Sequence, residues 1–136
     1  MKKRLLCLVL PIITLIFEIL PYGAVLNFML PAVEEGVPAG RFRELYSYFD
    51  LMPFGYGNFA PFITALMTCV IFLLLVIYVL AGKVQLARAA KGMLLACFII
   101  SFGPLILGPQ FLSVVGVLIS LLLIGEYMFL CFYVKI

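Results

Sequence analysis

The chain has 136 residues, of which 67% are hydrophobic and 11% are charged, and its formal net charge is +3. Soluble domains are about 45–50% apolar and about 25% charged, so this composition excludes an ordinary water-soluble globule and favours an integral membrane protein. Histidine is absent, and the basic residues flank apolar runs instead of forming a polar basic surface. We therefore expect no enzyme, no cofactor, no metal and no nucleic-acid partner.

The first apolar run follows Lys2, Lys3 and Arg4 and predicts a membrane span over residues 5–30. Pro21 leaves two alternatives for its length. A helix that continues through Pro21 must tilt or kink, and this longer form sets the predicted bounds. A helix that stops at Pro21 is just long enough to cross and places residues 23–30 at the outer surface.

A more polar stretch, residues 31–60, predicts one extracytoplasmic loop. Within it, Phe42, Leu45, Tyr46 and Phe49 recur at helical spacing. The spacing predicts a short amphipathic helix over residues 40–50 that lies on the membrane surface.

The same loop is rich in aromatic residues, for which two interpretations stand. One is an interfacial aromatic belt that needs no partner. The other is an extracytoplasmic recognition surface in which Tyr48, Asp50 and Tyr56 contact a ligand or a protein.

The remaining apolar runs predict three further spans, at residues 61–82, 92–107 and 111–134, with a cytoplasmic loop at residues 83–91. Proline begins the second span and glycine ends it. Glycine and proline at 103–104 and 108–109 predict a turn, so the last two spans form a helical hairpin. The expected fold class is an all-α integral membrane domain with four transmembrane helices.

Orientation follows from the distribution of lysine and arginine. Two basic residues, Arg41 and Arg43, fall on the side of the long loop. Seven fall on the other side: Lys2, Lys3, Arg4, Lys83, Arg88, Lys91 and Lys135. Because basic residues concentrate on the cytoplasmic side, we expect both termini in the cytoplasm and the chain in the cell membrane.

Two carboxylates, Glu18 and Glu126, lie within apolar runs. An ionisable group near the centre of a bilayer costs on the order of 3 kcal/mol, which makes both residues candidates for proton or cation exchange. The alternative is structural. Equal depth on the hairpin predicts an ion pair between Glu126 and Lys91. A short first span would let Glu18 reach water, Arg41 or Arg43.

Small residues on the last span form a stripe of Ser113, Gly116 and Ser120 that favours close helix packing, either within the chain or in a homodimer. The four cysteines lie inside apolar runs and lack the spacing of a metal or disulfide framework.

Two functions remain open. The first is a non-enzymatic accessory or scaffold subunit that binds a membrane-protein partner through its loop. The second is a proton-coupled transporter of a small molecule or cation that uses Glu18 and Glu126.

Overall fold

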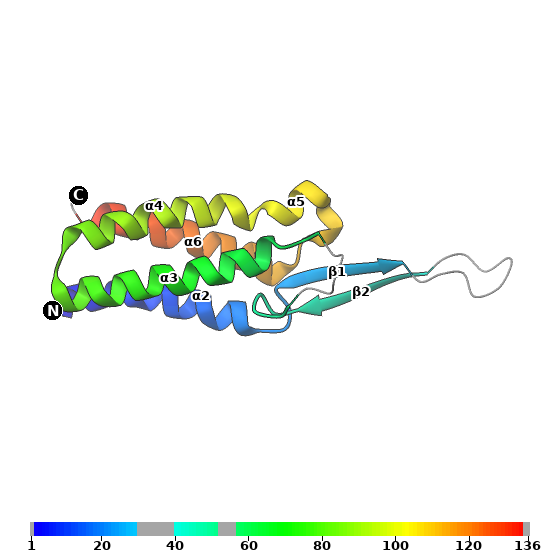
Figure 1. The fold of residues 1–136 in the computed structure, drawn as a ribbon, viewed down its shortest axis with the longest axis horizontal. Coiled ribbons are helices and arrows are strands. Elements are labelled where there is room, and N and C mark those ends of the chain that lie inside the picture. The colour runs from blue at the N-terminus through cyan, green and yellow to red at the C-terminus, as the bar shows by residue number, and fades with distance from the viewer. Residues whose placement is uncertain (1, 30–39, 52–56, 135–136) are drawn as a thin grey trace, which may run out of the picture.

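A computed structural model describes residues 2–29, 40–51 and 57–134. The fold is mostly helical, with a helix bundle from which a two-stranded hairpin extends at one end (Figure 1). The elements are α1 (Lys2–Leu5), the 3-10 helix η1 (Leu6–Leu8), α2 (Val9–Ile19), β1 (Ala24–Met29), β2 (Arg41–Tyr46), α3 (Ala60–Ala81), α4 (Val84–Ser101), α5 (Gly103–Leu107), η2 (Pro109–Phe111) and α6 (Val114–Tyr133).

The bundle is a ring of four helical segments. α2 packs against α3 and α6, and α4 packs against the same two helices from the other side. The hairpin of α4 and α6 that the glycine and proline pattern predicted is therefore present, with α5 and η2 forming its turn.

In the described part of the chain, three helical segments are long and apolar enough to cross a membrane: Ala60–Ala81, Val84–Leu107 and Val114–Tyr133. Their composition points to a membrane protein, as the sequence predicted. The segment Leu6–Ile19 is also apolar but shorter.

α2 buries polar side chains and exposes large apolar ones, which is the opposite of a surface helix in a soluble protein. Its buried face, continued from η1, carries Cys7, Pro11, Thr14 and Glu18. Its exposed large residues are apolar: Val9, Ile12, Ile16 and Ile19. Helices of soluble proteins turn their apolar face inward, whereas hydrocarbon solvates the outward apolar face seen here.

The predicted first span of residues 5–30 is wrong at its C-terminal end. The helix stops at Ile19, and Leu20 adopts an extended conformation with ψ 137°. Proline disfavours the helical conformation of the residue before it, so Pro21 ends the helix instead of kinking it. Ala24 to Met29 then form strand β1.

The predicted surface helix over residues 40–50 is also wrong, because Arg41–Tyr46 form strand β2. β2 pairs antiparallel with β1, in a register that places Ala24 opposite Tyr46 and Met29 opposite Arg41. The helical spacing of aromatic residues was a weak signal here, since pairing with a distant strand decided the conformation.

The helix α4 begins at Val84, so the predicted loop of residues 83–91 is mostly helical. Alanine-rich sequence with arginine and lysine favours helix, which explains the early start. Gly82 makes the turn, with a φ of +71° that glycine adopts without strain.

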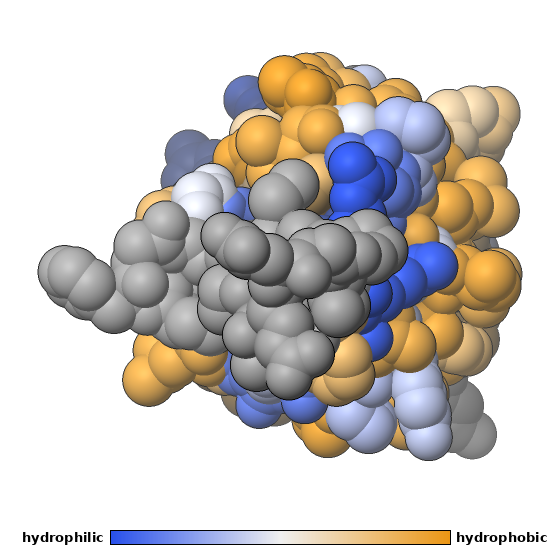
Figure 2. Space-filling view, turned by 90° about the vertical axis from the view of Figure 1, so that its right-hand side faces the viewer, coloured by the Kyte–Doolittle hydropathy of each residue, from blue (hydrophilic) through white to orange (hydrophobic). Residues whose placement is uncertain are grey.

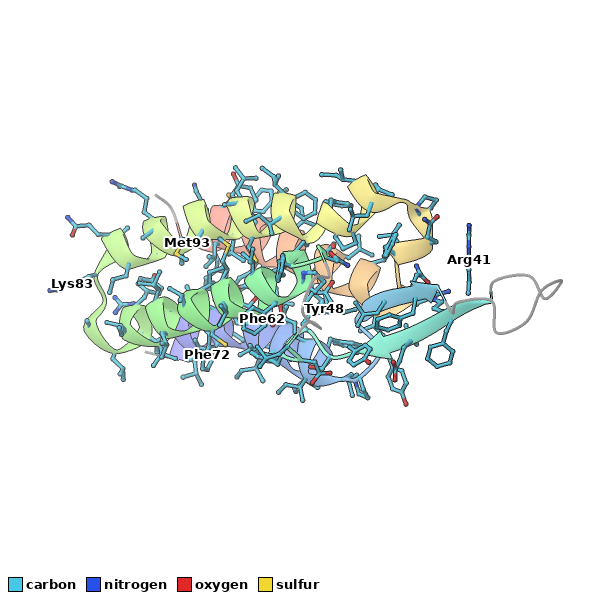
Figure 3. All side chains as sticks on the ribbon, turned by 45° about the vertical axis from the view of Figure 1, so that its right-hand side comes forward. Arg41, Tyr48, Phe62, Phe72, Lys83 and Met93 are labelled. Atoms are coloured by element: carbon cyan, nitrogen blue, oxygen red, sulfur yellow. The ribbon has the colours of Figure 1, made fainter. Side chains whose placement is uncertain are left out.

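Described basic residues lie at both ends of the bundle. The N-terminal helix, the turn at Lys83 and the end of α6 lie at one end of the bundle, and Arg41 lies at the other (Figures 1 and 3). Arg4 lies over the ring of Tyr78, 5.8 Å from its centroid, near the C-terminus of α3. A cation there is favourable because the helix dipole leaves negative partial charge at that end.

The hairpin joins the bundle through residues 47–48 and Gly23. The backbone N–H of Tyr48 and the hydroxyl of Ser47 both donate to the carbonyl of Glu18, at 3.0 and 2.9 Å, and so satisfy a free carbonyl at the end of α2. The Tyr48 ring packs against Gly23, where an added Cβ would lie 2.7 Å from a ring carbon.

We predict that Gly23→Ala lowers the stability of the folded protein by about 1–3 kcal/mol, because the new methyl group would push against the buried Tyr48 ring. Thermal unfolding in mild detergent measures this change. Gly92→Ala is the control, since a Cβ there meets no neighbour within 4 Å, and alanine should stabilise α4 by up to about 1 kcal/mol. Equal transition temperatures for the two variants would contradict the packing seen at Gly23.

Candidate functional site

Buried polar side chains lie along the interior of the bundle. Glu18 on α2 is 0% exposed and Glu126 on α6 is 1% exposed. Thr64 and Thr68 on α3 and Cys97 on α4 are buried with them. We call these five residues the core polar site. All four helices of the bundle contribute to it.

Glu18 is held by a threonine. The hydroxyl Oγ1 of Thr68 lies 2.8 Å from Oε1 of Glu18 and 3.0 Å from the carbonyl oxygen of Thr64. A hydroxyl has one proton, so it cannot fully donate to both acceptors. The Thr68 hydroxyl therefore shares its proton between the Glu18 carboxyl oxygen and the Thr64 carbonyl oxygen.

The other carboxylate oxygens have no hydrogen-bond partner among the described residues. They are Oε2 of Glu18 and both oxygens of Glu126. The ion pair predicted between Glu126 and Lys91 is therefore not formed as a hydrogen-bonded pair. Buried polar atoms without a partner are costly and rare in native proteins, which marks them as candidates for function.

The predicted contact of Glu18 with Arg41 or Arg43 is wrong. The short form of the first helix is correct, but it turns Glu18 into the bundle, where the side chain is fully buried. The position of Glu18 in the sequence indicates only its depth in the membrane. Helix packing decides whether its side chain faces the bundle interior or the hairpin.

The two carboxylates lie at different positions along the bundle. Glu18 is the penultimate residue of α2, next to the hairpin, whereas Glu126 lies within α6. The thiol of Cys97 lies 3.6 Å from the Thr64 carbonyl oxygen and 3.9 Å from Thr68 Oγ1. Glu18, Thr68, Thr64 and Cys97 thus form one connected cluster, to which no described hydrogen bond joins Glu126.

The recognition surface predicted from the loop is not assembled as expected. Tyr48 is 2% exposed and belongs to the junction, and its burial raises the pKa of its hydroxyl. Asp50 accepts a hydrogen bond from the backbone N–H of Ser47 at 2.8 Å, so it stabilises a local turn. Tyr56 lies outside the described residues.

The small-residue stripe contributes to packing within the chain. Ser113 caps α6 by accepting from the N–H of Gly116, and its hydroxyl donates to the carbonyl of Gly23. The hydroxyl of Ser120 lies 2.8 Å from that of Ser101 on α4. These contacts tie α6 to the hairpin and to α4.

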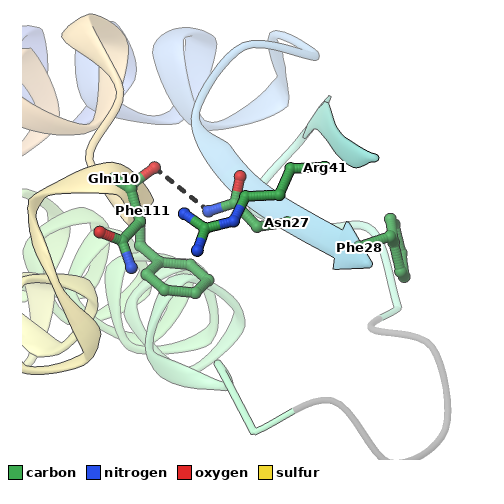
Figure 4. Close-up of a pocket in the computed structure, with 5 residues that line it drawn as sticks. All are labelled: Asn27, Phe28, Arg41, Gln110 and Phe111. Atoms are coloured by element: carbon green, nitrogen blue, oxygen red, sulfur yellow. Dashed lines mark hydrogen bonds between the residues drawn. The ribbon is translucent and has the colours of Figure 1, made fainter. Parts of the chain in front are cut away.

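Two cavities lie where the hairpin meets the turn before α6. The first, of about 220 Å³, is lined by Asn27, Phe28, Arg41, Gln110 and Phe111 (Figure 4). Within it, the side-chain amide of Asn27 donates to the carbonyl of Gln110 at 3.4 Å. The second cavity, of about 350 Å³, is lined by Tyr22, Arg43, Leu45, Ser113, Val114 and Val115. Hydrophilic residues gather at this end of the molecule, between hydrophobic flanks (Figure 2).

The thiols and carboxylates do not form a metal centre within residues 2–29, 40–51 and 57–134: no cluster of three or more acidic, cysteine or histidine side chains could hold an ion there. All four cysteines are free.

Comparison with known proteins gave no match to a family model, a curated protein or a solved structure.

Sequence reasoning found both carboxylates but missed Thr64, Thr68 and Cys97. A signal for the threonines was present. They are four residues apart in an otherwise apolar helix, so they share one helix face, and a polar stripe on a membrane helix faces its neighbours. Nothing in the sequence indicates that Glu18 and Thr68 meet.

We predict that Glu126→Leu raises the stability of the folded protein by about 1–3 kcal/mol, because leucine removes a buried carboxyl group whose oxygens have no partner in the described part of the chain. Thermal unfolding in mild detergent checks this. Glu44→Leu is the control, since Glu44 is exposed and accepts a hydrogen bond from Tyr46. A destabilised Glu126→Leu variant would show that the carboxyl group makes a favourable interaction.

Proposed function

We propose that the chain is a non-enzymatic, four-span membrane protein that binds and releases protons at Glu18 and Glu126, and that it works as a proton-coupled transporter of a small molecule or cation. The observation that carries the proposal is the burial of two carboxyl groups whose charges are not neutralised by any described cation. Such groups are retained in membrane helices where protons or ions are exchanged.

Two features of the described residues support this role over the structural alternatives. Glu126 makes no hydrogen-bonded pair with Lys91, and Glu18 turns away from the hairpin arginines. A carboxyl group that only stabilised the fold would have a charged or polar partner for each oxygen. Glu18 has one such partner, Thr68, and Glu126 has none among the described residues.

The proposed topology places both termini in the cytoplasm of the cell and the hairpin outside. The apolar helical segment Leu6–Ile19 is about 21 Å long at 1.5 Å per residue, shorter than the hydrocarbon thickness of about 30 Å. We take it as the first crossing, completed by the hairpin junction that follows it. Reporter fusions at the two termini test this topology, and opposite locations for the two would rule out an even number of crossings.

The experiment is labelling with dicyclohexylcarbodiimide, a hydrophobic reagent that attacks protonated carboxyl groups, followed by mass spectrometry of the protein in proteoliposomes. We expect modification of Glu18 and Glu126. It should decrease as pH rises, because the reactive form is the protonated acid. Proton uptake into the same vesicles, followed with an enclosed pH dye, should be lost in Glu18→Gln and in Glu126→Gln.

The control for both measurements is Glu44→Gln, which changes an exposed carboxylate on the hairpin. Thr68→Val is a second probe, since it removes the hydroxyl beside Glu18 but keeps the shape, and should shift the pH at which Glu18 becomes modified. Thr68→Ser should restore the original profile. Proton uptake that persists in the double Gln variant would overturn the proposal.

A second candidate function is an accessory or scaffold subunit that binds a membrane-protein partner, or a second copy of itself, through the hairpin. The observation that favours it is the exposure of strand β2, where the side chain of Phe42 is 50% exposed. Exposed apolar side chains on a strand are typical of protein contacts. Affinity isolation in mild detergent should recover a stoichiometric partner that Phe42→Ser loses, and recovery of the chain alone would exclude this role.

A further inference from the structure

The second hairpin cavity combines a positioned arginine with an apolar wall. Arg43 donates from Nη2 to the carbonyl of Leu112 at 3.1 Å, which holds the guanidinium against the turn that precedes α6. Tyr22 and Leu45 close the hairpin side of the cavity, and Val114 and Val115 close the helix side. We propose that this cavity binds the headgroup of an anionic phospholipid, with Arg43 contacting the phosphate.

The charge of Arg43 is available for an anion. Its one described hydrogen bond uses a single donor of a guanidinium that carries five, and no described carboxylate pairs with it. The neighbouring acidic residue, Glu44, lies on the opposite face of β2 and is occupied by the hydroxyl of Tyr46 at 2.6 Å. Arginine contacts phosphate through two parallel hydrogen bonds, which suits a guanidinium fixed at one nitrogen.

Arg41 adds a second positive charge on the same face. Side chains two residues apart on a strand point to the same side, so Arg41 and Arg43 both face the turn around Gln110 to Leu112. Arg41 lines the adjacent cavity, where Figure 4 shows its guanidinium beside Asn27 and Gln110. This end of the bundle therefore favours a headgroup with net negative charge over a zwitterionic one.

The cavity also continues onto an apolar surface that fits an acyl chain. Val114 is 80% exposed at the first turn of α6, and Val117, Leu118 and Leu121 continue the exposed stripe along the helix. α6 is long and apolar enough to cross a membrane, so its first turn lies at the level of the headgroups. An amphiphile placed there would meet arginine at its phosphate and valine and leucine at its chain.

The size of the cavity agrees with this occupant. Its volume of about 350 Å³ falls within the range of roughly 300–1,000 Å³ that is usual for small-ligand sites, and a phosphoglycerol headgroup is a ligand of that kind. A soluble phosphate would use the arginine and leave the valine and leucine surface without a role, which is why we commit to a lipid. The inference is independent of the two buried carboxylates.

The experiment titrates the detergent-purified protein with phosphatidylglycerol and, separately, with phosphatidylcholine, and follows binding by native mass spectrometry and by thermal stability. We expect tighter binding of phosphatidylglycerol. Arg43→Gln should weaken it about tenfold, the loss of one charge-assisted contact. Arg43→Lys should lie between the two, because it keeps the charge and loses the planar fork.

Arg88→Gln is the matched control, since it removes an exposed arginine at the other end of the bundle and should leave the affinity unchanged. Stability measured without lipid shows whether each variant folds. Equal binding of the two lipids, or an equal loss in Arg88→Gln, would overturn the proposal. So would glycerol 3-phosphate or inorganic phosphate binding as tightly as the lipid, because the site would then be one for soluble anions.

Discussion

The arrangement of this protein depends on hydrocarbon being the solvent of its outer surface. The exposed faces of the helices carry leucine, isoleucine, valine and phenylalanine, and most of the buried polar groups lie between the helices or at the hairpin junction. In water such a distribution would be unstable, whereas in a bilayer a polar group is least costly when it faces another helix. The core polar site is a consequence of this constraint.

The hairpin and the bundle are one unit because the end of α2 needs partners for its carbonyl groups. The chain after β2 returns to Glu18, where Ser47 and Tyr48 donate to the same carbonyl oxygen. The Tyr48 ring then fills the space above Gly23, and Ser113 at the start of α6 donates to the Gly23 carbonyl. The two proposed sites lie on either side of this junction: the carboxylates within the bundle and Arg43 on strand β2 of the hairpin.

The two buried carboxyl groups differ in their hydrogen bonding. Glu18 accepts a hydrogen bond from the Thr68 hydroxyl, while Glu126 has no hydrogen-bond partner among the described residues. A group that costs stability without an evident structural return is the kind that selection retains for activity. The serine contacts between α4 and α6, by contrast, are satisfied and hold the helices together.

The sequence by itself determined the membrane character, the helix α3 and the hairpin of the last two long helices. These properties depend on local composition, which needs no long-range contact to be expressed. Only the tertiary structure decided that Pro21 ends the first helix, that residues 41–46 pair as a strand with residues 24–29, and that Glu18 meets Thr68. Each of these depends on residues far apart in the chain, and a single sequence without long-range contacts does not specify which distant segments meet.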